Sequence, residues 1–528
     1  MKKILLMMAV ALTLGFVACK KADFADSYAD PSKISETTVE KQFAGFMVTN
    51  REYVLPSYWN YFVVLRTTIN RYTQAVGWVN STAQYVPGAA GITDRWGNYY
   101  SLLAQYRELQ KVYSKLSAAD QKEKRIYMIT AAIYLYDATQ KVVDLHGDIP
   151  FSEAGMLSAN SGDYTKSLPK YDTPETVYTK MLDDLKAFAV ELNSITVSAG
   201  IAIGFKNQDI VNNGDITAWK KYCNSLRLRM LTRVSGVTTF QSRYTSETAD
   251  ILGSAATYPV VADNTSNIQI DVTNLNSNIN SSGFRSGLED WSGNVAGKAI
   301  IDHMNTNADP RLRAIFQPGA SAVAGAYVGL NPSLTSTAQD LLVSGGTLAL
   351  YNWSTLTRNQ YFPGVLINAA EVNFLACESY LKAGNAASAK TAYNAGISNS
   401  IKFYYLVRTL SNDNASGALT ATTDAEIAAY SAKTAISWDL ALTQADKLKL
   451  IATQKWIHFN VVQPEENWAE IRRFDAPTLT FWSDAANAQT LPPVRWFYAA
   501  SEKTYNTVNY NAVTAKDKLT TKIFWDLN

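Results

Sequence analysis

Long stretches with a helical repeat, each opened by a capping residue, are the feature of this sequence that most restricts its fold. In residues 172–192, Thr173 can cap a helix, Pro174 takes the first helical position and Glu175 lies in the first turn. Apolar residues then recur every three or four positions and line one helix face. The same pattern occupies residues 117–147, 215–236 and 369–404. No alternation of strands and helices is visible, so we expect a mainly all-α fold and exclude a two-lobed α/β binding protein.

Residues 369–404 have the pattern of two helices packed side by side. Gly384 is suited to end the first helix, and Asn385 to cap the second. Small residues at the crossing and a length of about 34 residues per pair resemble a degenerate tetratricopeptide unit. We therefore expect a tetratricopeptide-like scaffold of helical hairpins. Between about 236 and 360, Ser, Thr, Asn and Gly dominate and the helical repeat fades, which predicts a loop-rich insert with short helices and a few strands.

The first 18 residues have the composition of a secretory signal peptide. Two lysines precede an apolar run that is shorter than the roughly 20 residues needed to cross a bilayer as a helix. Cys19 follows in an order that resembles a bacterial lipobox, so we expect this cysteine to be lipidated and to become the new N-terminus. A plain signal peptide cut nearby is the alternative. Residues 19–42 are polar and predict a flexible lipidated tether, and residues 43–528 predict a single helical body.

The charge of the chain is almost balanced. The sequence has 48 Lys and Arg against 46 Asp and Glu, a formal net charge of +2. Removal of the two lysines in the predicted leader makes the balance zero. No block of Lys and Arg occurs, so we expect no nucleic-acid partner and no long-range attraction to polyanions.

Sequence signals for catalysis and metal binding are sparse. The three histidines are far apart in the sequence, and neither they nor the cysteines have metal-ligand spacing. No nucleophile elbow, Walker loop or dinucleotide fingerprint occurs. The nearest match to a glycosidase is the pair Asp183–Asp184 or the pair Glu371–Glu378, but their spacing on a helix favours solvated or ion-paired groups. We therefore expect no enzyme, no catalytic residue and no metal site.

Two further groups of polar residues are expected to be structural. Cys223 and Cys377 are predicted to be buried thiols, since an exported protein stapled by disulfides would have more cysteines; a bridge between them is the alternative. Arg229 and Arg233 lie near the end of a predicted helix, where they favour ion pairs over a binding patch.

Aromatic residues in polar, loop-like segments are the best candidates for ligand contacts. Residues 77–100 combine Gly and Asn with large rings, and a ring on a loop can offer an apolar face while Asn or Tyr supplies hydrogen bonds. The alternative is that these rings fix the loop onto the body. Two further tryptophans lie among turn signals in the predicted insert. The candidates are Trp78, Tyr85, Trp96, Tyr99, Trp291 and Trp353.

A series of short strings, in the expected order along the chain, resembles motifs of the SusD/RagB family of outer-membrane lipoproteins of Bacteroidetes-type bacteria. The strings are DLHGDIPFSEA (144–154), NNGDITAWKKYCNSLRLRMLTRVS (212–235), DPRL (309–312), AAEVNFLACESYLKAG (369–384), QKWIHF (454–459), WAEIRRFDAP (468–477), PVRWFYAASEKTYNTVNY (493–510) and TTKIFWD (520–526). The last string resembles the closing tryptophan-bearing strand of the family. Together they cover nearly the whole chain after the leader.

The resemblance implies a non-enzymatic lid that captures a nutrient oligomer and sits on a TonB-dependent, SusC-like β-barrel transporter. It places the protein at the outer membrane, lipid-anchored at Cys19 and facing the cell surface. A glycan is the commonest ligand, and RagB-like peptide uptake is the alternative; a surface glycoside hydrolase is the alternative from another class. Some members hold a calcium ion, but no Asp-rich loop here predicts one, so we expect no cofactor. Ligand contacts vary between members, so no binding residue is transferred.

Overall fold

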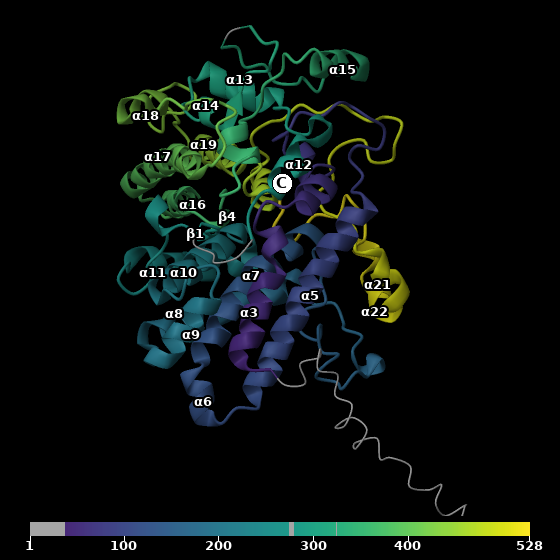
Figure 1. Ribbon diagram of the computed structural model, residues 1–528, viewed down its shortest axis with the longest axis vertical. Coiled ribbons are helices and arrows are strands. Elements are labelled where there is room, and N and C mark those ends of the chain that lie inside the picture. The colour runs from purple at the N-terminus through teal and green to yellow at the C-terminus, as the bar shows by residue number, and fades with distance from the viewer. Residues whose placement is uncertain (1–36, 274–278, 324) are drawn as a thin grey trace, which may run out of the picture.

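The computed structural model describes residues 37–273, 279–323 and 325–528, and helices dominate these ranges (Figure 1). The predicted signal peptide, Cys19 and most of the predicted tether lie outside the described residues. The first helix, α3 (Val39–Thr49), begins four residues before the expected boundary at 43. Thr38 caps it by accepting a hydrogen bond from the backbone N–H of Lys41, and Phe43 is buried in the core.

Helix α7 (Arg125–His146) is the centre of the N-terminal half. It is buried on almost every side, as expected of a helix surrounded by others. The helices α3, α5 (Ala89–Ser114), α8 (Pro174–Ser194) and α10 (Ile216–Arg233) all pack against it (Figure 1). The helices predicted in residues 172–192 and 215–236 are confirmed. The long helix predicted for residues 117–147 is interrupted at Lys124, between α6 (Ala118–Glu123) and α7.

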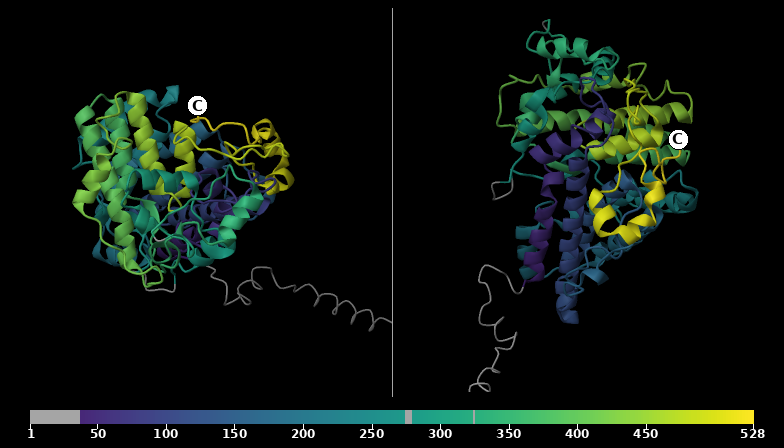
Figure 2. Two further views of the ribbon diagram at one scale, coloured as in Figure 1. Left: turned by 90° about the horizontal axis from the view of Figure 1, so that it is seen from above. Right: turned by 90° about the vertical axis from the view of Figure 1, so that its right-hand side faces the viewer.

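The C-terminal half contains the predicted helical hairpin. Helices α16 (Ala369–Lys382) and α17 (Ala386–Leu410) lie side by side, and Asn385 caps α17 by accepting from the backbone N–H of Ser388 (Figures 1 and 2). A Cβ at Gly396 would lie 2.5 Å from the ring of Phe374, so only glycine permits this close approach. The scaffold continues through α18 (Asp424–Ser431), α19 (Gln444–Phe459) and α20 (Pro464–Phe474).

Residues 236–360 fold into helices and small strand pairs joined by long connections. The helices are α11 (Gln241–Gly253), α12 (Gly283–Glu289), α13 (Lys298–Thr306), α14 (Leu312–Ile315) and α15 (Ser336–Ser344). The strands pair antiparallel, β1 (Ile268–Ile270) with β4 (Gly364–Ile367) and β2 (Phe316–Gln317) with β3 (Leu350–Tyr351). Since β4 leads directly into α16, the β1–β4 pair joins this region to the helical hairpin.

The tail of the chain does not form the expected strand. Residues 520–526 have no strand pairing, but Trp525 is buried and its indole N–H donates to Asp144 at 2.7 Å. The side chain therefore anchors the tail where a strand was predicted. Helices α21 (Ala500–Tyr505) and α22 (Thr507–Asn511) lie beside α5 (Figures 1 and 2). The remaining elements are α4 (Ile69–Tyr72), α9 (Ala199–Gln208), η1 (Arg51–Tyr53), η2 (Trp59–Leu65), η3 (Tyr164–Lys166), η4 (Thr238–Phe240), η5 (Asn264–Ser266), η6 (Asp290–Ser292), η7 (Trp353–Thr357) and η8 (Thr514–Lys516).

Buried ion pairs connect α10 to its neighbours. Arg229 pairs with Glu371 on α16 and, at 3.1 Å, with Asp137 on α7. Arg233 pairs with Glu466 on α20. The predicted ion-pair role of both arginines is confirmed. Because these pairs are buried, loss of one partner would leave the other as an unpaired buried charge.

The two cysteines of the body are free and buried, as predicted. Burial raises the pKa of the Cys223 thiol to about 12, so it stays protonated and unreactive at neutral pH. Across the described ranges, none of the helices is both long and apolar enough to cross a membrane.

Candidate functional site

A group of exposed aromatic rings lies where η2 meets α12 and the short turn η6 that follows it. Helix η2 has π-type hydrogen bonding, which is frequent at functional sites. Glycine allows α12 to lie directly on η2, because a Cβ at Gly287 would be 2.8 Å from the Cβ of Tyr61. The turn after α12 then carries Trp291 next to the rings of η2.

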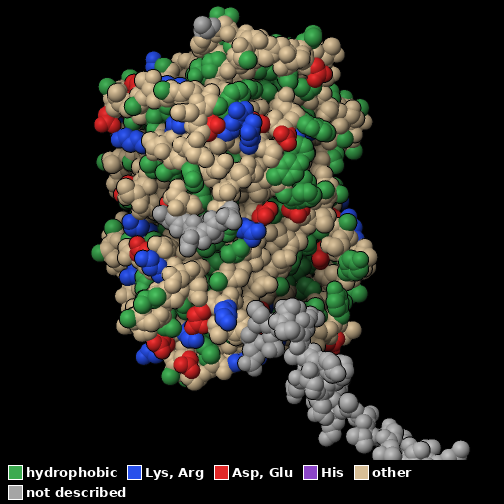
Figure 3. All heavy atoms as spheres, in the orientation of Figure 1, with side chains coloured by type: hydrophobic (Ala, Val, Ile, Leu, Met, Phe, Trp, Pro, Cys, Tyr) green, Lys and Arg blue, Asp and Glu red, His purple; other side chains and the backbone are tan. Residues whose placement is uncertain are grey.

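Tyr58, Phe62 and Trp291 form what we call the aromatic surface. The rings of Tyr58 and Phe62 stack with centroids 5.0 Å apart and planes 16° apart. Trp291 meets Phe62 edge to face, at 6.0 Å and 86°. Tyr58 is 40% exposed and Trp291 84% exposed. Hydrophobic side chains gather on this part of the molecule in Figure 3. The rings thus form an apolar corner open to solvent.

The buried guanidinium of Arg66 supports the aromatic surface from behind. Its central carbon lies 4.7 Å from the ring centroid of Phe62 and 5.7 Å from that of Trp291. One N–H also donates to the backbone carbonyl of Trp291 at 3.1 Å. Burial lowers the pKa of Arg66. The cation therefore fixes both rings before any ligand arrives.

Trp78 forms a second layer under the aromatic surface. Its half-buried ring lies 5.2 Å from the guanidinium carbon of Arg66 and 3.7 Å from that of Arg71. Arg71 donates to the carbonyl of Gln84 at 2.7 Å, and burial lowers its pKa to about 10. Arg71 stays charged at neutral pH, so Trp78 is held between two cations.

The backbone of Trp291 has a left-handed conformation, with φ 55° and ψ 37°. Bulky residues rarely adopt this region, and it costs on the order of 1–3 kcal/mol. The hydrogen bond from Arg66 to the Trp291 carbonyl helps to hold it. A strained and exposed tryptophan with a fixed ring is typical of a recognition site.

The structure brings two of the six predicted ligand contacts to this site. Trp291 is part of the aromatic surface and Trp78 supports it. Trp353 lies on η7, half-buried, with the guanidinium of Arg358 at 3.9 Å over its ring. Arg358 is held at 2.9 Å by Glu289 of α12, so Trp353 is covered and does not join the three rings.

Tyr85, Trp96 and Tyr99 lie inside the protein. The loop expected over residues 77–100 is wrong for its second part, because residues 89–100 belong to α5. Trp96 packs edge to face on His146, and the hydroxyl of Tyr99 bonds that of Thr139 at 3.2 Å. The hydroxyl of Tyr85 donates to the carbonyl of Trp482 at 2.8 Å. All three side chains are buried, so a ligand on the surface does not reach them.

Comparison with known families identifies the fold. A family model described as SusD-like, starch-binding and associating with the outer membrane matches residues 37–499. The chain belongs to the SusD-like family. The family is described as associated with the outer membrane, and its members are binding proteins. A comparison with curated proteins finds no match.

Several solved SusD-like structures are similar to this chain. A chitin-binding protein superposes with a TM-score of 0.73 at 22% identity, covering 92% of this chain and 100% of that chain. A chitin-binding SusD homologue from Flavobacterium johnsoniae gives 0.70 at 21% identity, with 93% and 99% covered. A SusD homologue from Bacteroides fragilis gives 0.72 at 18%, with 93% and 100% covered. At these identities the likeness establishes the fold.

The residues Tyr58, Trp59 and Phe62 of this SusD-like protein are not among those predicted from its sequence. Trp59, next to the aromatic surface in the chain, is 45% exposed. The available signal was the run of aromatics from 58 to 62, with Tyr58 and Phe62 four residues apart on one helix face. Such a pair usually belongs to a core, and only the tertiary structure shows that this face points outward.

The carboxylate pairs considered for a glycosidase are occupied by ion pairs. Each carboxylate has a basic partner within 4 Å: Arg229 for Glu371, Arg473 for Glu378, Arg243 for Asp183 and Lys180 for Asp184. Glu371 and Glu378 are also fully buried, so they do not face each other across a cleft. Within the described ranges, no cluster of three or more His, Cys, Asp or Glu is arranged to hold a metal ion.

Proposed function

We propose that this SusD-like protein is a non-catalytic surface lipoprotein that binds a neutral oligosaccharide on the aromatic surface. It then delivers the oligosaccharide to a TonB-dependent, SusC-like transporter in the outer membrane. The observation that carries the proposal is Trp291, a ring that is 84% exposed yet fixed by Arg66 and Phe62. The C–H face of a pyranose is apolar and packs on an aromatic ring, while the sugar hydroxyls stay in water.

The net charge of the chain and its similarity to solved structures restrict the class of ligand. The balanced charge gives no steering towards polyanions, which supports an uncharged glycan. Two of the similar solved structures are chitin-binding proteins. A β-linked N-acetylglucosamine oligomer is therefore the first ligand to test. A starch-type α-glucan is the second, because the family description names starch.

Isothermal titration calorimetry with chitohexaose and maltohexaose tests the binding site. We expect at least one of them to bind and its affinity to fall at least tenfold in Trp291→Ala, a loss of about 1.4 kcal/mol. Tyr505→Ala is the matched control, since Tyr505 on α21 is 72% exposed and lies outside the aromatic surface. Equal affinity in Trp291→Ala and wild type would contradict the proposal. Binding of a hexapeptide alone would favour RagB-like peptide uptake.

The absence of catalysis is tested on the same ligands. Incubation of the protein with chitohexaose and maltohexaose, followed by chromatography, is expected to return each oligomer intact. Release of shorter products, lost on substitution of a surface carboxylate, would establish the glycoside hydrolase alternative instead.

The lipid anchor and the transporter partner rest on the sequence around Cys19 and on the outer-membrane association of the family. Mass spectrometry of the protein from cells is expected to find an acylated N-terminal Cys19, and an unmodified N-terminal peptide would contradict this. Detergent extraction with a tag on the C-terminus is expected to co-purify a large barrel protein. Recovery of this chain alone from its own outer membrane would count against delivery to a transporter.

A further inference from the structure

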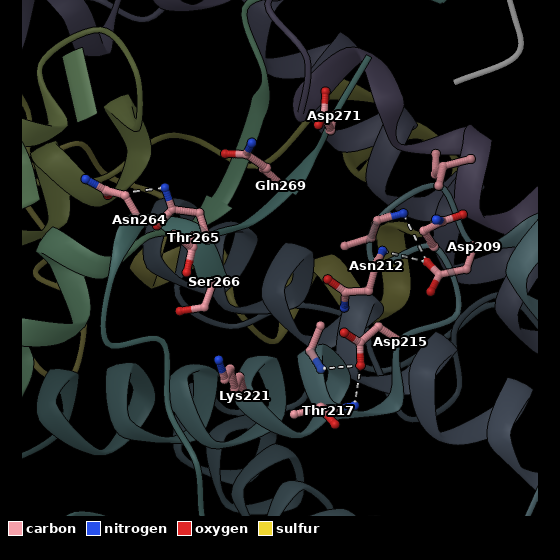
Figure 4. A pocket seen from close by; sticks show the side chains of 15 residues that line it. Asp209, Asn212, Asp215, Thr217, Lys221, Asn264, Thr265, Ser266, Gln269 and Asp271 are labelled. Carbon is pink, nitrogen blue, oxygen red and sulfur yellow. Dashed lines mark hydrogen bonds between the residues drawn. The ribbon is translucent and has the colours of Figure 1, made fainter. Parts of the chain in front are cut away.

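A polar pocket lies apart from the aromatic surface, between the beginning of α10 and strand β1 (Figure 4). Its volume is about 320 Å³, at the low end of the range of roughly 300–1,000 Å³ for small-molecule sites. The loop 209–215 and the first turns of α10 form one wall. Helix η5 and β1 form the other, and no residue of the aromatic surface lines it. A ligand of this pocket is therefore small and separate from one on the rings.

The loop wall is held in place by a buried carboxylate. Asp209 accepts hydrogen bonds from the backbone N–H groups of Val211, Asn212 and Gly214 at 2.9–3.0 Å. It also accepts from the indole N–H of Trp219 at 2.6 Å. These four bonds fix the loop and occupy the Asp209 carboxylate. The wall is thus pre-formed, and other groups must contact a ligand.

The opposite wall is also fixed by the fold. The amide of Asn264 donates to the carbonyl of Asn399 on α17 at 2.9 Å. The hydroxyl of Ser266 donates to the carbonyl of Asp263 at 2.9 Å. Gln269 lies on β1, opposite Val365 of β4. Both walls therefore keep the pocket open without a ligand.

The groups that line the pocket suit a hydroxyl-rich and uncharged ligand. Amides and hydroxyls predominate, with Thr217 and Lys221 on one side and Gln269 across the opening (Figure 4). Lys221 forms no ion pair within the described ranges, and it shares the lining with the carboxylates of Asp209, Asp215 and Asp271. One cation against three carboxylates disfavours phosphates and other anions. Each sugar hydroxyl both donates and accepts, which matches this mixture of groups.

Two wall amides have hydrogen-bonding capacity that the fold does not use. Asn212 Nδ2 and Gln269 Oε1 are buried and have no hydrogen-bond partner among the described residues. Buried polar atoms are normally paired, so unpaired amides on both walls point to a polar ligand. Since no aromatic ring lines the pocket, the ligand is recognised by hydrogen bonds and not by stacking.

We propose that this pocket binds one neutral sugar residue through its hydroxyl groups and is a second carbohydrate site, independent of the aromatic surface. The ammonium of Lys221 and the side-chain amide of Asn213 line the pocket and form no hydrogen bond or ion pair with the rest of the described residues. A free monosaccharide and the end unit of an oligosaccharide present the same hydroxyls, and the two sources are separated by the experiment below.

Ligand-observed NMR on the full chain tests the pocket with glucose, galactose, mannose and N-acetylglucosamine at millimolar concentration. The pocket variants are Lys221→Met, which keeps the aliphatic stem, and Asn213→Gly, which suits the φ of 51° at this position. Lys220→Met is the control, because Lys220 precedes Lys221 on α10 and does not line the pocket. We expect at least one sugar to bind, with at least tenfold weaker binding in both pocket variants and unchanged binding in Lys220→Met and Trp291→Ala.

Three results with the sugars would overturn this inference. They are no binding of any of the four sugars, binding that survives both pocket variants, and binding that is lost in Trp291→Ala. Binding of glycine or alanine in the pocket instead of sugars would also overturn it, since the ligand would then be a zwitterion. Repeating the titration with chitohexaose shows which source supplies the sugar. If the pocket binds free monosaccharides, Lys221→Met weakens the binding of monosaccharides only. If it binds the end of a chain, Lys221→Met weakens the binding of both monosaccharides and chitohexaose. The calorimetric test of Trp291 does not depend on Lys221, so the two proposals fail separately.

Discussion

At the scale of single residues, exposure and backbone strain coincide at Trp291. The ring is 84% exposed, and its φ of 55° belongs to a region that glycine adopts without cost. Two neighbouring contacts keep it in place, the hydrogen bond from Arg66 and the edge-to-face contact with Phe62. A position that served only the fold would favour glycine here, which supports the proposal that the ring of Trp291 contacts a ligand.

Removing the strain at position 291 is expected to separate stability from binding. Trp291→Gly should have a free energy of unfolding about 1 kcal/mol higher than Trp291→Ala, because alanine keeps the left-handed strain and glycine does not. Both variants should lose oligosaccharide affinity equally. Urea denaturation and calorimetry measure the two effects. An alanine variant as stable as the glycine variant would show that the backbone at 291 is not left-handed.

The sequence identified some residues of the site and missed others for physical reasons. Trp291 and Trp78 lie among turn signals, where an exposed ring is a reasonable prediction. Tyr58 and Phe62 lie four residues apart on a helix, the pattern of a core face, and nothing local shows that the face is open. Trp96 was predicted as a ligand contact, but its ring packs on His146 in the core.

At the scale of elements, local signals were sufficient where capping and periodicity agree. Helix α10 is capped by Asp215 as expected, and its buried face includes Trp219 and Leu226. Helix α5 shows the limit. Its first half contains Gly91, Gly97 and Asn98, which favour loops, but the helix buries nine residues against its neighbours. Packing of this extent outweighs the low helix propensity of glycine, which is about 1 kcal/mol less favourable than alanine in a helix.

The ion pairs of α10 give a prediction for the stability of the helical body. Arg229→Leu is expected to lower the free energy of unfolding by about 3–5 kcal/mol, because Glu371 would stay buried without its cation. Lys298→Leu is the control, since its pair with Asp302 is solvent-exposed and should change stability by less than about 1 kcal/mol. Denaturant unfolding of both variants decides the matter. A loss below about 1 kcal/mol in Arg229→Leu would mean that Glu371 finds another partner or becomes protonated.

At the scale of the whole molecule, the core holds histidines in their neutral form. Burial lowers the pKa of His146 and of His458 to about 3, against an ordinary value of 6.5. His458 lies between the hydroxyl of Ser400 at 2.9 Å and the side-chain oxygen of Asn368 at 2.8 Å. The nearby charge of Arg311 also opposes its protonation. Between about pH 3 and 6.5, His146 and His458 are therefore neutral in the folded protein and protonated in the unfolded chain.

Stability is accordingly expected to fall as the pH decreases from about 6.5 towards 3. Above pH 6.5 both states are neutral at these histidines and the full stability is present. Below it the unfolded state gains protons, and each histidine contributes a loss of about 1.4 kcal/mol per pH unit. Unfolding curves at pH 7, 6, 5 and 4 measure the slope. In His458→Gln, the dependence of the free energy of unfolding on pH should decrease by about 1.4 kcal/mol per pH unit, the contribution of one histidine. An unchanged slope would contradict the burial of a neutral His458.

The assembly of the site depends on contacts that the order of the sequence does not reveal. Arg66 and Trp291 are 225 residues apart, yet one hydrogen bond joins them. Local periodicity predicts the helical-hairpin scaffold, and the strings that resemble family motifs predict the order of its elements along the chain. The aromatic surface requires α12 to lie on η2, which depends on a glycine at 287 and on packing across the chain. For this reason the fold was predictable and the site was predictable only in part.

Hydroxyl-radical footprinting with mass spectrometry is the most direct test of where the ligand lies. The protein is oxidised alone and with a saturating concentration of the oligosaccharide that binds most tightly in calorimetry. We expect oxidation of the peptide containing Trp291 to slow several-fold with the ligand, while the peptide containing the exposed Tyr505 is oxidised at an unchanged rate. An unchanged rate at Trp291 in the saturated protein would contradict the aromatic surface as the binding site.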